Sequence, residues 1–146
     1  MIQEKRRYIE TEIGINVRFS EVDAMRVVWH GNYLKYFEDA REALAARNNL
    51  NYLDIASRGF LVPIVRTEMD HLWPITYGSN AKIIVRLVDT RAAKIIHEYE
   101  VWDLDANKLS ARGKTIQVFV TADRNLILTV PDFFEQWKEG LNWIAP

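Results

Sequence analysis

The most informative stretch of the chain is Ser20-Glu21-Val22-Asp23-Ala24-Met25-Arg26-Val27-Val28-Trp29-His30-Gly31-Asn32-Tyr33. It joins an alternating strand pattern to a strongly apolar helix pattern and has no sustained period of its own. One acidic residue, Asp23, lies in this irregular segment. Because neither flanking element needs Asp23 for packing, this residue is a candidate for chemistry.

The segments on either side of this stretch have clear periods. Apolar and polar residues alternate from Glu12 to Phe19, which predicts a half-buried strand. Apolar residues then recur at helical spacing, at Tyr33, Leu34, Tyr36, Phe37, Ala40, Ala43 and Leu44. Asn32 can cap this helix, and the pair Asn48-Asn49 can end it.

The remainder of the chain predicts mainly strands. The long apolar segment from Phe60 to Ile75 has Pro63 and Pro74 near its ends, which indicates a bend or an edge at each. Alternation predicts further strands near residues 83–87, 95–101 and 116–120, with turns at 77–80, 89–92 and 103–108. The tail from Pro131 to Lys138 predicts a short helix that has proline at its start.

The order of these elements favours an α+β fold, in which a strand and a long buried helix precede an antiparallel meander of about four strands. No linker, repeat or low-complexity segment divides the chain, so we expect residues 1–146 to form one domain. A curved sheet around a single helix leaves an open flank with exposed edges. We therefore expect at least a homodimer.

Composition excludes several classes of function. The net charge of -1 provides no field that would attract nucleic acid, and the chain has no cysteine for thiolate catalysis, disulfides or thiolate metal sites. No apolar run approaches the roughly 20 residues that cross a bilayer. Residues 1–7 are polar and no apolar run follows them, so we expect no secretory signal and a cytoplasmic protein.

Asp23 and the residues after it are the candidates for catalysis. An aspartate carboxylate can act as a base or a nucleophile, and the helix start offers amides for a developing oxyanion; the alternative is that Asp23 closes a turn. His30 could donate to a substrate carbonyl, orient Asp23, or cap the helix. Trp29 and Tyr33 could line an acyl pocket or be core aromatics.

The remaining titratable residues give no further motif. His71 and His97 are isolated within strand patterns, where we expect a structural role. No two histidines have metal-ligand spacing, and no serine-hydrolase elbow, phosphate loop or dinucleotide fingerprint is present, so we expect neither a metal nor a cofactor.

The runs Arg18-Phe19-Ser20-Glu21-Val22-Asp23-Ala24 and Val27-Val28-Trp29-His30-Gly31-Asn32-Tyr33-Leu34-Lys35-Tyr36-Phe37-Glu38 resemble the signature of hotdog-fold acyl-CoA thioesterases. More narrowly, they resemble the 4-hydroxybenzoyl-CoA thioesterase/YbgC-like branch. The resemblance extends to residues 59–65 and 115–120, and covers the chain from about Glu12 to Trp137.

This resemblance implies a five-stranded antiparallel sheet wrapped around the helix, in dimers and often tetramers. The reaction would hydrolyse an acyl-CoA, or an acyl-carrier-protein thioester, to the free acid. Asp23 would be the catalytic nucleophile or general base. His30 would bind or polarise the thioester, and Tyr33 would lie beside it.

The resemblance also implies that the CoA runs between subunits. Four basic residues are candidates for its phosphates: Arg91, Lys94, Arg112 and Lys114.

One position departs from the family pattern, and several alternatives stay open. Arg26 stands where the family usually has glycine, and it could narrow the acyl pocket or pair with an acidic group, with a CoA phosphate or with Asp23. The main alternative function is a non-catalytic hotdog module that binds acyl-CoA or acyl-carrier protein. Hotdog dehydratases place a His and a helical Glu or Asp differently, and this chain has no matching pair. The specific motif argues against a purely structural oligomer.

Overall fold

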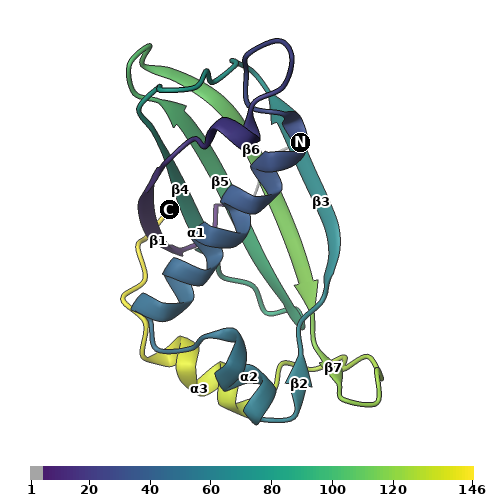
Figure 1. Cartoon of the computed structure of the whole chain (residues 1–146). Coiled ribbons are helices and arrows are strands. Elements are labelled where there is room, and N and C mark those ends of the chain that lie inside the picture. Colours follow the sequence, from purple (N-terminus) through teal and green to yellow (C-terminus); the bar gives the residue numbers. More distant parts are fainter. Residues whose placement is uncertain (1–4) are drawn as a thin grey trace.

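A five-stranded antiparallel sheet curves around helix α1 (Tyr33–Arg47), with its strands in the order β1-β4-β5-β6-β3 (Figure 1). The computed structural model describes residues 5–146, and residues 1–4 of the polar N-terminal segment lie outside the described residues. The strands are β1 (Tyr8–Ile15), β3 (Ile64–His71), β4 (Ala81–Val88), β5 (Lys94–Asp103) and β6 (Lys108–Val118). The α+β class and the five-stranded sheet around a central helix are confirmed.

The sheet topology differs from the predicted meander in one respect. Strands β4, β5 and β6 are hairpin neighbours, as predicted, but β3 pairs with β6 rather than with β4, the next strand in the chain. Strand β1 pairs with the other side of β4. The chain therefore crosses from one edge of the sheet to the other between β1 and β3, and α1 is part of that crossing.

The first strand begins and ends earlier than its alternation predicts. It covers Tyr8–Ile15 rather than Glu12 to Phe19, because its partner β4 begins at Ala81, directly opposite Ile15. Past Ile15 the chain leaves the sheet. Phe19 lies in the 3-10 turn η1 (Phe19–Glu21), and 77% of its surface is exposed.

The last long strand also begins earlier than predicted, at Lys108 rather than near Ile116. Arg112 and Lys114 therefore lie within β6 and not before it. Small residues, including Ser110 and Gly113, interrupt the apolar alternation in this half of the strand and conceal it from sequence reasoning. The packing of α1 explains why they are small.

Four short elements gather at one end of the sheet. Helix α2 (Tyr52–Ser57) is absent from the sequence prediction. The prediction places Phe60 and Val120 in longer strands, whereas they lie in the short separate pair β2 (Phe60–Leu61) and β7 (Val120–Thr121). Asn51 and Asp54 form a reciprocal capping box at the start of α2, which is a signal that the sequence contained. Helix α3 (Asp132–Glu139) follows Pro131, as predicted.

Phe37 sets the distance between α1 and the sheet. Its ring stacks on Tyr99 of β5 with the ring centroids 4.0 Å apart, and it covers Gly113, the residue of β6 that pairs with Tyr99. A Cβ at position 113 would lie 2.5 Å from the Phe37 ring and 2.9 Å from the carbonyl oxygen of Glu68. The helix can approach the sheet this closely only because Gly113 has no side chain.

Gly113→Ala should lower the free energy of unfolding by about 1–3 kcal/mol, because the added methyl group must displace the Phe37 ring or the β3 backbone. Urea unfolding measures this loss. The matched control is Gly14→Ala in β1, where a Cβ would meet no atom within 4 Å. Equal stability of the two variants would contradict the close approach at Gly113.

Candidate active site

Asp23 lies in a tight loop formed by residues 22–28. Its amide donates to the carbonyl of Val27 at 2.9 Å, and its own carbonyl accepts the amide of Arg26 at 2.9 Å. Its Oδ1 accepts the amide of Met25 at 2.8 Å, which is an Asx-type turn. The turn-closing role is therefore present, while the other carboxylate oxygen has no hydrogen bond within residues 5–146.

Arg26 has the backbone conformation that glycine would provide at this position. Its φ of 65° lies in the left-handed region, which costs a non-glycine residue about 1–2 kcal/mol. Its side chain is exposed. In the described chain the Asp23 carboxylate bonds to the Met25 amide and not to the guanidinium of Arg26.

Glu21 ties this loop to α1. Its carboxylate Oε1 accepts the hydroxyl of Tyr36 at 3.2 Å and the amide of Arg18 at 2.8 Å. Its carbonyl accepts the amide of Trp29 at 2.9 Å and the side-chain amide of Asn32 at 2.8 Å. Sequence reasoning did not assign Glu21 a role, because the contact with Tyr36 becomes visible only in the folded chain.

Asn32 does not cap α1 in the predicted way. Its backbone is already helical, and its side chain donates to Glu21 instead of accepting a helix amide. The 3-10 turn η2 (His30–Asn32) runs directly into α1, and its hydrogen bonds begin with the amides of Asn32 and Tyr33. The amides left at the start of this helical segment are those of His30 and Gly31, at the positive end of the helix dipole.

Four rings gather where α1 begins. The ring centroids of Trp29 and His30 lie 4.9 Å apart, those of His30 and His71 lie 6.3 Å apart, and those of His71 and Tyr33 lie 5.0 Å apart. His71 ends β3 and pairs with Ala111, which puts its side chain on the face of the sheet that α1 covers. The sequence prediction of a purely structural His71 missed this contact with two predicted site residues.

Tyr33 contacts the other rings through its own ring, while its hydroxyl is bonded to Ser110. The hydroxyl lies 3.0 Å from Oγ of Ser110, which itself donates to the carbonyl of Trp73 at 2.6 Å, so Tyr33 is the donor. Burial raises the pKa of the Tyr33 hydroxyl. Trp29 is half exposed, and its ring covers Gly31, where a Cβ would lie only 2.2 Å from the indole.

The four basic residues considered for phosphate binding lie away from this loop. Arg91 and Lys94 are exposed at the β4–β5 turn, at the far end of the sheet. Arg112 and Lys114 alternate with residues that face α1, so they project from the opposite face of the sheet, where Arg112 pairs with Asp70 at 3.0 Å. Their assignment to CoA stays a prediction.

No three His, Asp or Glu side chains of residues 5–146 gather closely enough to hold a metal ion. None of the helices there is both long and apolar enough to cross a membrane.

The sequence model of the Thioesterase-like superfamily matches residues 17–138. The chain is 28% identical over 123 residues to YneP of Bacillus subtilis, whose name describes an acyl-CoA thioesterase; the match covers 84% of this chain and 88% of YneP. It is 29% identical over 126 residues to the 1,4-dihydroxy-2-naphthoyl-CoA hydrolase of Nostoc punctiforme, covering 84% and 82% of the two chains. The solved DHNA-CoA thioesterase of Staphylococcus aureus matches with a TM-score of 0.77 and 25% identity, over 90% of this chain and 87% of that one.

Tyr36→Phe removes the hydroxyl that donates a hydrogen bond to Glu21. It should lower the free energy of unfolding at pH 7 by about 1–2 kcal/mol. Burial, and then the charge of Glu21, raise the pKa of the Tyr36 hydroxyl above its usual value of 10. Because the raised pKa belongs to the folded state, this stabilisation is complete below pH 10 and is lost as the pH rises beyond it.

Urea unfolding from pH 7 to pH 11 tests this contact. The gap in stability between the wild type and Tyr36→Phe should narrow above pH 10. Tyr52→Phe is the control, since Tyr52 is 58% exposed. A gap that is absent at pH 7, or that matches the control, would contradict the account.

Proposed function

The chain belongs to the Thioesterase-like superfamily, and on this basis we propose that it hydrolyses an acyl-CoA thioester to a free acid and CoA, with Asp23 as the reacting carboxylate. The resemblance to hotdog-fold thioesterases is confirmed by the family match and by the fold. The observation that carries the proposal is the loop geometry. One oxygen of Asp23 fixes the turn through Met25, and the other is left for chemistry.

Two routes use this carboxylate. In the nucleophilic route, an oxygen of Asp23 adds to the thioester carbonyl carbon, the C–S bond breaks, the thiolate leaves and takes a proton from solvent, and water hydrolyses the resulting mixed anhydride. In the general-base route, Asp23 takes a proton from the water that adds to the carbonyl carbon. The C–S bond then breaks, and the proton held by Asp23 passes to the leaving thiolate. Both routes place negative charge on the carbonyl oxygen.

The start of the helical segment suits that charge. The amides of His30 and Gly31 are hydrogen-bond donors at the positive end of the helix, as an oxyanion requires. The exposed His30 ring can polarise the same carbonyl. The half-exposed Trp29 provides an apolar surface beside it.

The alternative is a non-catalytic module that binds acyl-CoA or acyl-carrier protein. The Asx turn supports this alternative, because closing the turn through Met25 is by itself a structural role for Asp23. The two functions differ in one observable property. The module would bind the thioester and leave it intact.

Asp23→Asn separates these functions, because an asparagine Oδ1 still accepts the Met25 amide while the carboxylate is lost. Release of free thiol from a panel of acyl-CoAs should fall at least about 100-fold, with an unchanged melting temperature. Asp123→Asn, in an exposed loop, should react like the wild type. Binding of acyl-CoA by the wild type without thiol release would establish the module instead.

A homodimer formed through β3 fits the proposed enzyme. Strand β3 ends the sheet, and all of its residues except Met69 are exposed; such an edge is a template for pairing. In an antiparallel self-pairing centred on Thr67, Arg66 faces Glu68 of the partner subunit. The twofold axis makes the α1 helices of the two subunits run in opposite directions. The partner's Asp23 loop therefore lies near the end of the first subunit's sheet where β4 ends and β5 begins. The CoA would then run between the subunits.

Sedimentation velocity should give twice the chain mass of 17.1 kDa. Arg66→Glu or Glu68→Arg alone puts like charges opposite each other. Because the twofold axis repeats this contact, each dimer contains it twice, and the dimer dissociation constant should rise by about tenfold. The double swap Arg66→Glu with Glu68→Arg should restore the affinity. A wild-type monomer at all concentrations, or a double swap weaker than both single variants, would contradict this interface.

A further inference from the structure

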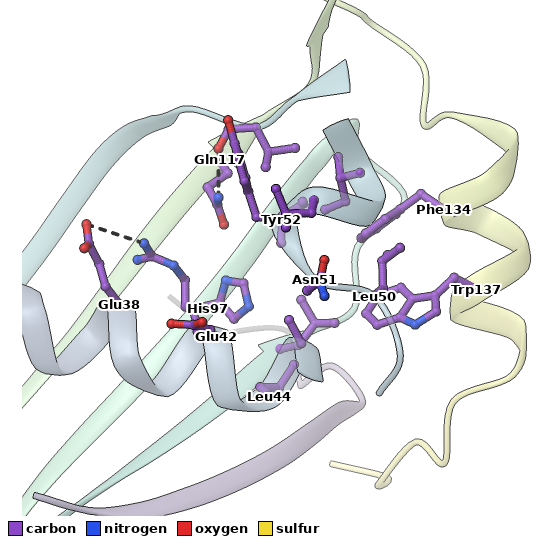
Figure 2. Close-up of a pocket in the computed structure, with 17 residues that line it drawn as sticks. Glu38, Glu42, Leu44, Leu50, Asn51, Tyr52, His97, Gln117, Phe134 and Trp137 are labelled. Atoms are coloured by element: carbon purple, nitrogen blue, oxygen red, sulfur yellow. Dashed lines mark hydrogen bonds and ion pairs between the residues drawn. The ribbon is translucent and has the colours of Figure 1, made fainter. Parts of the chain in front are cut away.

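A cavity of about 480 Å³ lies against the C-terminal half of α1 (Figure 2). The Asp23 loop of the same chain precedes the opposite, N-terminal end of this helix. Helices α2 and α3 complete its walls, and the ends of β4, β5 and β6 form its floor. Most of its lining is apolar and includes Leu44, Leu50, Ile55, Val62, Ile95 and Phe134. Its volume falls within the range of small-molecule sites, about 300–1,000 Å³.

Uncharged polar side chains interrupt this apolar lining, among them His97 and Gln117. His97 of β5 and Gln117 of β6 lie on neighbouring strands and both face the cavity. Burial, and then the charge of Arg41, lower the pKa of His97 to about 3, so its imidazole is neutral at physiological pH. Gln117 donates from Nε2 to the carbonyl of Val62 at 2.8 Å; its amide oxygen has no hydrogen bond within the described chain.

His97 also lacks a hydrogen bond that a buried nitrogen normally makes. Two buried side-chain atoms in residues 5–146 have no hydrogen-bond partner, Nδ1 of His97 and Oδ1 of Asp89. The Asp89 oxygen is compensated by the ammonium group of Lys138 at 2.8 Å, whereas Nδ1 of His97 makes neither a hydrogen bond nor an ion pair within residues 5–146. An unpaired buried polar atom of this kind requires an explanation, and a bound ligand is one.

The charges around the cavity disfavour an anionic ligand. Among residues 5–146, the one cation in its lining is Arg41. This residue is already engaged, since it donates to the hydroxyl of Tyr99 at 3.1 Å and lies 3.9 Å from the carboxylate of Glu38. Glu42 adds a second carboxylate to the same helix face. Figure 2 shows both glutamates on α1 near His97.

We propose that this cavity binds the acyl group of the thioester and selects an uncharged chain that carries a hydroxyl, with His97 and Gln117 as the specificity-determining residues. The inference rests on the proposed thioesterase function. A hydroxyl both donates and accepts, so it can bond to the His97 ring in either tautomer and to the amide oxygen of Gln117. A carboxylate at the same place would face Glu38 and Glu42 without a free cation.

The proposed dimer connects this cavity to the chemistry. The cavity lies where β4 ends and β5 begins, which is the end of the sheet that the partner's Asp23 loop approaches in a twofold pairing through β3. The thioester carbonyl would react at that loop, while the acyl group extends into this cavity. The residues that select the acyl group and the carboxylate that cleaves the thioester would then belong to different subunits.

The test compares acyl-CoAs of equal length that end in a methyl group, a hydroxyl or a carboxylate, at four, six, eight and ten carbons. For at least one length, kcat/KM of the wild type should be about tenfold higher for the hydroxyl than for the methyl end, and lowest for the carboxylate. His97→Leu should abolish the hydroxyl preference, so that kcat/KM for the hydroxyl series falls to that for the methyl series. It should not reduce stability, because an unpaired buried nitrogen is removed.

Gln117→Leu provides a second variant and should reduce the same preference, with Gln136→Leu on the exposed side of α3 as the matched control. Equal rates for methyl and hydroxyl ends at every length in the wild type would overturn the proposal. So would a hydroxyl preference that survives in both His97→Leu and Gln117→Leu.

If the wild type releases no thiol from any acyl-CoA, the thioesterase proposal fails and the cavity is tested by itself. Calorimetry then compares 1,8-octanediol with 1-octanol. Tighter binding of the diol to the wild type, lost in His97→Leu, supports the selective cavity. Equal binding of the two alcohols, or no binding of either, overturns it.

Discussion

Glu21 makes the contacts on which the rest of the site depends. Its carbonyl receives the amides of Trp29 and of the Asn32 side chain, and its carboxylate receives the Tyr36 hydroxyl. The start and the end of the irregular segment are thereby fixed to the first turns of α1. Within that frame the loop can close on itself through Asp23, and a helix start becomes available beside it. Without that frame, a short segment of this kind would be free to sample many conformations.

The sheet supplies the second constraint. Phe37 packs on Tyr99 over the bare backbone of Gly113, so α1 lies close to β5 and β6. The same helix therefore carries the candidate reaction site at its start and one wall of the apolar cavity along its C-terminal half. A twofold axis at β3 would bring the reaction site of one subunit close to the cavity of the other, because the two copies of α1 would run in opposite directions.

The sequence predicted those features that depend on local patterns. The helix from Tyr33, its end before Asn48 and the hairpin strands follow from apolar periodicity and short turns. Features that depend on distant partners were wrong or missed. The first strand ends at Ile15 because β4 begins opposite it, and His71 meets Tyr33 only after β3 joins the far edge of the sheet. The glycine-like φ of Arg26 follows from the loop, not from the residue type.

The most direct test of the central claim is a crystal structure of the Asp23→Asn variant with a bound acyl-CoA. The thioester carbonyl carbon should lie against the side chain at position 23, with the carbonyl oxygen facing the amides of His30 and Gly31. An acyl-CoA whose thioester lies away from this loop, for example on the outer face of the sheet beside Arg112, would contradict it.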